Sequence, residues 1–171
     1  AVAIAHGYAK VAGKPLAAIV HSNVGLMHAS MAIFNAWVDR VPVLVLGATG
    51  PVDAAKRRPW IDWMHTAQDQ GALIRDFSKW DAQPASVGAS YEALLRAKQI
   101  ALTAPAGPTY VCFDVSLQET RIDAIPPLPD VSRYPVPSPA APAQEALARA
   151  ADLLSSAVRP VILMGRVSRS S

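Results

Sequence analysis

Short apolar runs alternate with helical patterns along most of this chain, and that alternation limits what it can fold into. The runs Leu16–Val20, Pro42–Leu46 and Pro108–Val115 each predict a short buried strand. Parallel strands need crossover connections, and the helical patterns between the runs supply them. The sequence therefore predicts an α/β fold, a doubly wound parallel sheet with helices on both faces.

The helical patterns come from apolar residues that recur every three or four positions. Met27, Met31, Phe34 and Val38 are one example, and we expect this stripe on a helix over residues 24–38. Further predicted helices cover residues 1–12, 66–74, 85–102 and 147–158. Two further strands are predicted, a small one at Phe77–Trp80 and a buried one at Val161–Met164.

A proline-rich segment divides the chain. Pro126–Pro142 carries seven of the fifteen prolines, so it lacks many backbone donors and predicts an extended connection rather than part of a sheet. We expect an α/β domain over residues 1–118, a linker over 119–142 and the start of a second α/β domain over 143–171. Because the pattern starts within a helix and stops after a strand, we expect the fold to be incomplete at both ends.

Composition and charge narrow the class of protein. The net charge is +3, but the basic residues are scattered apart from Lys56, Arg57 and Arg58, so we expect no nucleic-acid partner. The apolar runs are shorter than the ~20 residues that cross a bilayer, so we expect no membrane partner. Cys112, the single cysteine, lies in an apolar run and predicts a buried thiol. With no secretory signal in the chain, we expect a cytoplasmic protein.

His21 and Ser22 are the candidate residues for chemistry. They follow the first apolar run directly, and ligands of open α/β sheets bind beyond the carboxyl ends of the strands. Neighbouring side chains on extended backbone point to opposite faces, so the pair does not form a Ser/His/Asp triad. A hydrogen-bonded structural histidine is the alternative. His28 lies seven residues further on, in the helix predicted over residues 24–38. It either has a packing role there or borders the same crevice.

Two other motifs fall short of a site. Asp62, His65 and Asp69 have the spacing of metal ligands on one helical face, but without a fourth ligand a solvated helix face is the better interpretation. We therefore predict no metal site. The GATG motif at residues 47–50 follows a strand but lacks the patterns of nucleotide-binding loops.

Several segments in order resemble the pyrimidine-binding domain of thiamine-diphosphate enzymes, the 2-oxo acid decarboxylases and acetolactate synthases. They are AVAIAHGYAKVAGKP, AAIVHSNVGLMHASMAIFNAW, VPVLVLGATGP and APAGPTYV. The likeness covers residues 1–118, and the later RPVILMGR resembles the opening of the family's central domain. The HS pair at 21–22, with KW at 79–80 and PAS at 84–86, is most similar to benzoylformate decarboxylase. The resemblance thus implies the thiamine-diphosphate-binding fold.

The resemblance also implies an activity. It indicates part of an enzyme that decarboxylates a small 2-oxo acid through a C2-thiazolium adduct and an enamine. It further implies a homodimer or homotetramer with the active site between subunits. An acetolactate synthase-like carboligase stays an alternative, although those enzymes usually have threonine or a similar residue in place of His21. A non-catalytic nucleotide-binding or structural α/β module is the other alternative.

Roles for particular residues follow from the resemblance. His21 and Ser22 are expected in catalysis, with His21 orienting substrate or moving a proton. His21, Val24 and His28 are expected to border the thiamine diphosphate ring, although the family often has asparagine where His28 stands. The family's catalytic glutamate would precede Ala1, and its Mg²⁺ and diphosphate are held by a C-terminal domain. The resemblance leaves open whether FAD binds the central domain. We therefore expect the 171-residue chain alone to be inactive.

Overall fold

The structure is a computed structural model that describes residues 1–165. By the contacts along its backbone the chain divides into two compact units, residues 1–138 and residues 139–171. The first unit contains the sheet and the candidate site. No helix among the described residues is long and apolar enough to span a membrane.

A parallel four-stranded sheet forms the centre of the first unit. Its strands are β1 (Leu16–Ile19), β2 (Val43–Thr49), β3 (Asp81–Ala82) and β4 (Thr109–Asp114). They lie in the order β1-β2-β4-β3, and every neighbouring pair runs parallel. All carboxyl ends therefore meet at one edge of the sheet, the edge where ligands bind in folds of this kind.

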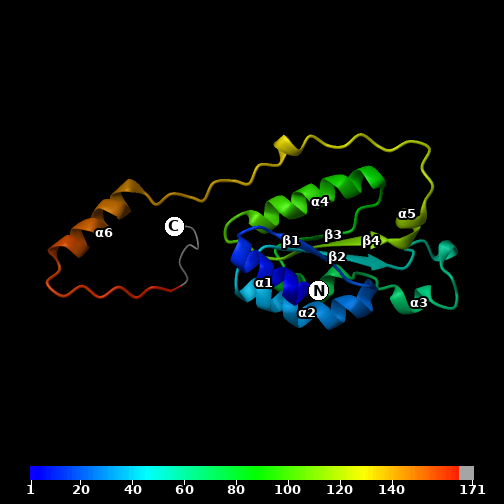
Figure 1. Cartoon of the computed structure of the whole chain (residues 1–171), viewed down its shortest axis with the longest axis horizontal. Coiled ribbons are helices and arrows are strands. Elements are labelled where there is room, and N and C mark those ends of the chain that lie inside the picture. The colour runs from blue at the N-terminus through cyan, green and yellow to red at the C-terminus, as the bar shows by residue number, and fades with distance from the viewer. Residues whose placement is uncertain (166–171) are drawn as a thin grey trace. The chain divides into compact units, whose positions relative to one another are not determined.

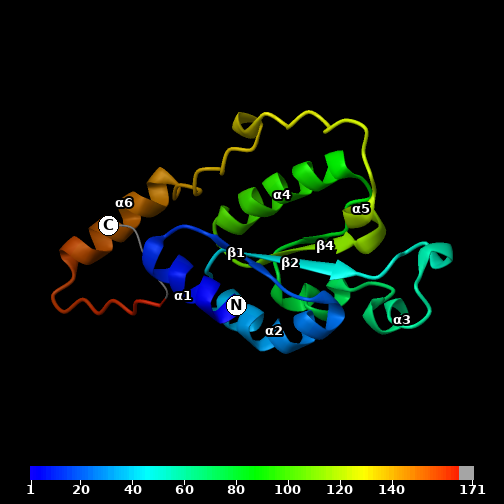
Figure 2. The same cartoon turned by 45° about the vertical axis from the view of Figure 1, so that its right-hand side comes forward.

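Helices cover both faces of this sheet. Figures 1 and 2 show α1 (Val2–Ala12) and α2 (Ser22–Val38) on one face and α4 (Val87–Leu102) on the opposite face. The two short helices α3 (Asp62–His65) and α5 (Val115–Glu119) follow the carboxyl ends of β2 and β4. The predicted doubly wound α/β fold is confirmed.

The two faces of β2 pack against different helices. Val43 and Val45 are fully buried in the main core cluster, which they share with Leu26 and Ile33 of α2. Leu46 packs on the other side, in the cluster built around α4. This alternation along the strand gives each face of the sheet its own core.

The helix predicted over residues 24–38 is present as α2, but the apolar stripe that predicts it lies on the exposed side of the helix. Met27, Met31 and Phe34 are exposed, whereas the buried stripe consists of Leu26, Ala29, Ile33 and Ala36. The helix carries no charged residue, so both of its sides are apolar and the spacing alone did not identify the side that faces the sheet.

The region between β2 and β4 also differs from the predictions. Residues 66–74 do not form a continuous helix, because the helix ends at His65 and 3-10 turns follow at Gly71–Leu73 and Arg75–Phe77. Gln70 is buried here, and its Nε2 donates hydrogen bonds to the Ala48 carbonyl oxygen at 2.9 Å and to the Tyr110 hydroxyl at 2.8 Å. These tertiary bonds hold the segment against the sheet in place of a regular helix.

The small strand lies slightly later than predicted. The prediction was residues 77–80, and β3 is Asp81–Ala82, although the Lys79 backbone N–H already donates to the Pro108 carbonyl oxygen at 2.8 Å. Cys112 is buried as predicted, and burial raises the pKa of its thiol. A buried, neutral thiol is a packing residue.

The proline-rich segment is extended and has one 3-10 turn, Val131–Arg133. Its residues up to 138 belong to the first unit, where Gln99 Nε2 of α4 donates a hydrogen bond to the Pro135 carbonyl oxygen at 2.6 Å. In the second unit, α6 spans Gln144–Ser156. The predicted strand at residues 161–164 is absent from the described chain, and its four side chains are exposed. A strand obtains its hydrogen bonds from neighbouring strands, and residues 139–165 contain none.

Candidate active site

His21 lies at the carboxyl end of β1. The preceding residue, Val20, still donates its backbone N–H to the Leu46 carbonyl oxygen of β2 at 2.8 Å, and α2 begins directly after His21. His21 is the N-cap residue of α2, yet its side chain makes no capping hydrogen bond. The imidazole is exposed to solvent at the ligand-binding edge of the sheet.

Ser22, in contrast to His21, is buried, with 3% of its surface exposed. Its backbone lies in the left-handed region at φ 51°, which costs free energy for a residue other than glycine. Its hydroxyl donates a hydrogen bond to the His65 carbonyl oxygen at 2.8 Å. The serine therefore connects the start of α2 to the α3 segment.

Val24 and His28 lie on the same side of α2 as His21. The spacings of three and four residues put them in one stripe along the helix. Both side chains are exposed, and His28 makes no hydrogen bond among the described residues. The stripe combines an apolar side chain with two imidazoles that can each donate and accept hydrogen bonds.

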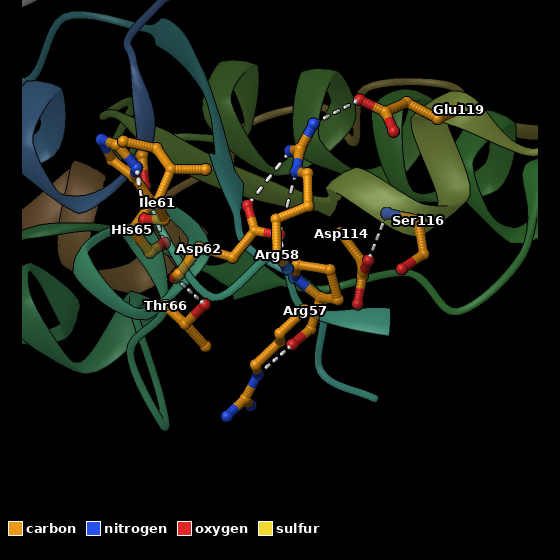
Figure 3. A network of polar contacts seen from close by, with 11 residues as sticks. Arg57, Arg58, Ile61, Asp62, His65, Thr66, Asp114, Ser116 and Glu119 are labelled. Atoms are coloured by element: carbon orange, nitrogen blue, oxygen red, sulfur yellow. Dashed lines mark hydrogen bonds and ion pairs between the residues drawn. The ribbon is translucent and has the colours of Figure 1, made fainter. Parts of the chain in front are cut away.

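A network of polar contacts stabilises the loop that follows β2 (Figure 3). Asp62 is buried, and its two carboxylate oxygens accept hydrogen bonds from the guanidinium of Arg58 at 3.1 Å and from the Arg58 backbone N–H at 2.7 Å. The hydrogen bonds from Arg58 lower the pKa of Asp62 below its usual value. Arg58 also lies 3.6 Å from the Glu119 carboxylate of α5. The pair of Arg58 and Asp62 thus stabilises the loop from within, and the contact of Arg58 with Glu119 connects the loop to α5.

Asp62, His65 and Asp69, whose spacing resembles that of metal ligands, have separate partners in the structure. Asp62 is paired with Arg58, and Asp69 instead forms a bidentate ion pair with Arg75 at 2.8 Å. Within residues 1–165, no group of three potential ligands is placed to hold a metal ion. The alternative of a solvated helix face is wrong for Asp62, which the arginine pair keeps buried.

His65, which the sequence suggested only as a possible metal ligand, lies beside His21, a contact that sequence reasoning missed. Its ring lies against that of His21, with centroids 4.9 Å apart and planes at 71°. Its backbone carbonyl oxygen accepts hydrogen bonds from the Ser22 hydroxyl and from the Gly50 N–H at 3.0 Å. No local sequence signal pairs His21 with His65, because the contact depends on the folded path of the loop after β2.

The GATG glycines serve packing. A Cβ on Gly47 would lie 2.3 Å from the Tyr110 hydroxyl, and one on Gly50 would lie 2.2 Å from Thr66 Oγ1. Real Cβ atoms do not approach so closely, so both positions require glycine for close contact. Close packing therefore accounts for both glycines of the motif.

A cavity of about 640 Å³ opens beyond the ends of β2 and β4. Its lining comes from residues 52–56, 83–87 and 114–120, and it includes the Ser86 N-cap of α4. His21 is not part of that lining. The carboxyl edge of the sheet therefore carries two separate features, the histidine pair beyond β1 and this cavity beyond β4.

Comparison with known proteins finds a family model that matches the first part of the chain. The model described as "Thiamine pyrophosphate enzyme, N-terminal TPP binding domain" matches residues 1–74. That segment contains α1, β1, α2, β2 and the histidine pair. The resemblance to the pyrimidine-binding domain of thiamine-diphosphate enzymes is therefore confirmed over residues 1–74.

Curated relatives match over nearly the whole chain. A probable 2-ketoarginine decarboxylase of Pseudomonas aeruginosa is 29% identical over 164 residues, which is 95% of this chain and 28% of the relative. The acetolactate synthase large subunit IlvG of Mycobacterium tuberculosis is 29% identical over 170 residues, covering 94% of this chain and 28% of the relative. The chain thus spans little more than a quarter of the length of these relatives.

Solved structures share the fold. Benzoylformate decarboxylase from Polynucleobacter necessarius superposes with a TM-score of 0.76 at 22% identity, covering 91% of this chain and 28% of that one. The thiamine diphosphate-dependent 4-hydroxybenzoylformate decarboxylase of Rhodococcus jostii RHA1 gives a TM-score of 0.76 at 21% identity, covering 94% and 29%. These similarities confirm the thiamine-diphosphate-binding fold.

Proposed function

We propose that this chain is part of an enzyme that uses thiamine diphosphate to decarboxylate a small 2-oxo acid. The observation that carries the proposal is the exposed imidazole of His21 at the carboxyl end of β1, inside the segment that matches the family model. The similarity to a probable 2-ketoarginine decarboxylase supports the same reaction class.

His21 is the residue to which we assign proton movement. An imidazole can donate or accept a proton, and it can orient the carboxylate or the carbonyl oxygen of a bound substrate. Ser22 is assigned a positioning role, because its buried hydroxyl is engaged with the His65 carbonyl oxygen.

The residues beside His21 fit the ring of thiamine diphosphate. The stripe of His21, Val24 and His28 offers an apolar contact and two groups that hydrogen-bond in either sense, which suits a flat aminopyrimidine. When bound, the cofactor supplies the carbon nucleophile for the 2-oxo group. Since residues 1–165 form no cluster of metal ligands, Mg²⁺ and the diphosphate are assigned to another part of the complete protein.

A carboligase of the acetolactate synthase type is the second candidate. The match to an acetolactate synthase large subunit at 29% identity favours it. In such an enzyme a second carbonyl compound would be captured where a decarboxylase releases an aldehyde. The open question of FAD belongs to this alternative.

The complete protein is proposed to be a homodimer or homotetramer with its active site between subunits, located in the cytoplasm. The exposed apolar side chains on α2, including Met27 and Met31, support the proposal of an oligomer, because monomeric surfaces seldom carry such a continuous apolar strip. On this view the 171-residue chain alone has no catalytic activity.

The test is His21→Ala in the complete protein, assayed with pyruvate and with an aromatic 2-oxo acid. We expect turnover to fall by about 100-fold or more, since general acid–base catalysis contributes that much, while folding is unchanged. His6→Gln, which alters a histidine bonded to Asp39 at the other end of α2, is the control and should keep full turnover. Unchanged turnover in His21→Ala would remove His21 from the reaction, and product analysis separates aldehyde from ligated hydroxy ketone.

A further inference from the structure

We propose that His65 is a positioning residue that holds the imidazole of His21 in its working orientation. The inference rests on the function proposed above, in which His21 moves a proton. The two rings meet edge to face, at 4.9 Å between centroids and 71° between planes. Edge-to-face packing is a favoured arrangement of aromatic rings and restricts the rotation of both.

The His21 ring has little else to orient it. It makes no hydrogen bond to any of residues 1–165, and it is exposed beyond the end of β1. Its contact with His65 is the one ring contact that the structure gives it among these residues. An exposed side chain without such a contact samples several rotamers, and each productive event then requires the right one.

The His65 ring, in contrast, is held from its own segment. Nδ1 lies 3.2 Å from the Ile61 carbonyl oxygen, and since a carbonyl only accepts, Nδ1 carries the hydrogen and donates it. The other ring nitrogen, Nε2, is therefore the unprotonated one in the neutral ring. The bond to Ile61 fixes both the tautomer and the ring plane (Figure 3).

Three hydrogen bonds hold the backbone of His65 and of the preceding residue to the residues that follow β1 and β2. Its carbonyl oxygen accepts from the Ser22 hydroxyl at 2.8 Å and from the Gly50 N–H at 3.0 Å. The preceding carbonyl, that of Met64, accepts from Asn23 Nδ2 at 3.0 Å. His65 is thus attached to the residues that follow both β1 and β2, so its ring has a defined position relative to His21.

The charged neighbours of the pair are already engaged. Asp62, which lies one helical turn before Thr66 in the same segment, has both oxygens on Arg58. No ion pair links either histidine of this pair to an acidic group in residues 1–165. The arrangement therefore acts on His21 through packing and orientation.

Three variants of the complete enzyme test this. His65→Ala removes the ring and should lower kcat about 10-fold to 100-fold with KM little changed, since a displaced catalytic group costs rate of that order. His65→Phe restores a ring of similar shape and should recover most of kcat. In the His21→Ala background, His65→Ala should cause no further loss, because its effect passes through His21. All three leave the backbone bonds of His65 to Ser22 and Gly50 in place.

A readout that does not need turnover is the ring ¹H–¹³C NMR signal of His21 in protein with labelled histidine. His65→Ala should shift this signal, because a neighbouring ring and a restricted orientation are both lost. His6→Gln is the matched control, since it removes an imidazole elsewhere and should leave the His21 signal in place.

The outcomes separate the two proposals. If His21→Ala lowers turnover and His65→Ala does not, the positioning role fails and the proposed function stands. A His65→Phe variant as slow as His65→Ala, an additive loss in the double variant, or an unmoved His21 signal would each overturn the positioning role. If His21→Ala itself has full turnover, the role given to His21 fails and the inference about His65 fails with it.

Discussion

The helices α2 and α4 both connect strands across the sheet, yet their outer sides differ. The outer side of α4 carries Glu92, Arg96 and Lys98, all exposed. The outer side of α2 has no charged residue and exposes Met27 and Met31 by more than half of their surface. Charged side chains are at ease in water, whereas a continuous apolar strip is typical of a surface that another part of a protein covers. Of the two helices, only α4 has the charged outer side that is typical of a solvent-exposed surface.

Their inner sides differ as well. On α2 the fully buried side chains include the large Leu26 and Ile33, whereas on α4 the buried residues are Ala93, Ala97 and Ala101. Small residues let a helix approach a sheet closely, and large ones fill a wider gap. The core on the α2 side therefore depends on side-chain volume.

The largest expected effect concerns that volume. Ile33→Ala should lower the free energy of unfolding by about 2–5 kcal/mol, because it leaves a cavity in the core between α2 and the sheet. Met31→Ala, on the exposed side of the same helix, should change it by less than about 0.5 kcal/mol. Urea unfolding measures both. Equal losses would mean that the two sides of α2 are not distinct.

The next effect concerns how the two helices begin. α4 has a capping serine, since Ser86 Oγ accepts a hydrogen bond from the Ala89 N–H at 3.1 Å. Ser86→Ala should therefore cost about 1 kcal/mol of stability. His21, at the equivalent position of α2, makes no cap bond, so His21→Ala should have almost no effect on stability. A similar loss in both variants, measured by urea unfolding, would contradict this difference.

The smallest expected effect is on the pH dependence of stability. It concerns Asp62, which belongs to the α3 segment that contacts the start of α2. The pKa of Asp62 is lowered in the folded state by its hydrogen bonds with Arg58. Its stabilising contribution is therefore fully present above the unfolded value of about 3.9 and is lost as pH falls through the lower folded-state pKa. Unfolding midpoints measured from pH 7 to pH 2 should fall less steeply in Asp62→Asn. An unchanged slope would show that the pair does not contribute.

The inner strands β2 and β4 could be predicted from the sequence because they are largely buried, whereas β1, which was also predicted as buried, exposes Leu16 and Ile19 at the edge of the sheet. Runs such as Pro42–Leu46 have no competing pattern, and β2 begins within one residue of that prediction. For α2 the pattern correctly predicted a helix but left its inner side undetermined, since nothing in an uncharged helix marks the stripe of Leu26 and Ile33 as the inner one. Periodicity predicts a helix, and only contrast between its sides predicts how it packs.

The candidate site could be predicted only in part, for a similar reason. The position of His21 follows from the strand that precedes it, so a local pattern was sufficient. The neighbour of His21, His65, is brought there by contacts that span the chain, such as those of Ser22 with the His65 carbonyl and of Gln70 with Tyr110. Side-chain bonds of this range leave no periodic signal in the sequence.

β1 is an edge strand of the sheet, and this has a practical consequence. β1 pairs with β2 alone among the described strands, and Ile19 is 76% exposed. An edge strand of this kind offers a row of unpaired N–H and C=O groups with which a strand of another chain can pair, and an exposed isoleucine side chain favours such pairing. Preparations of the 171-residue chain should therefore form strand-to-strand aggregates as concentration rises, and a charged residue in place of Ile19 is the substitution to choose for keeping it in solution.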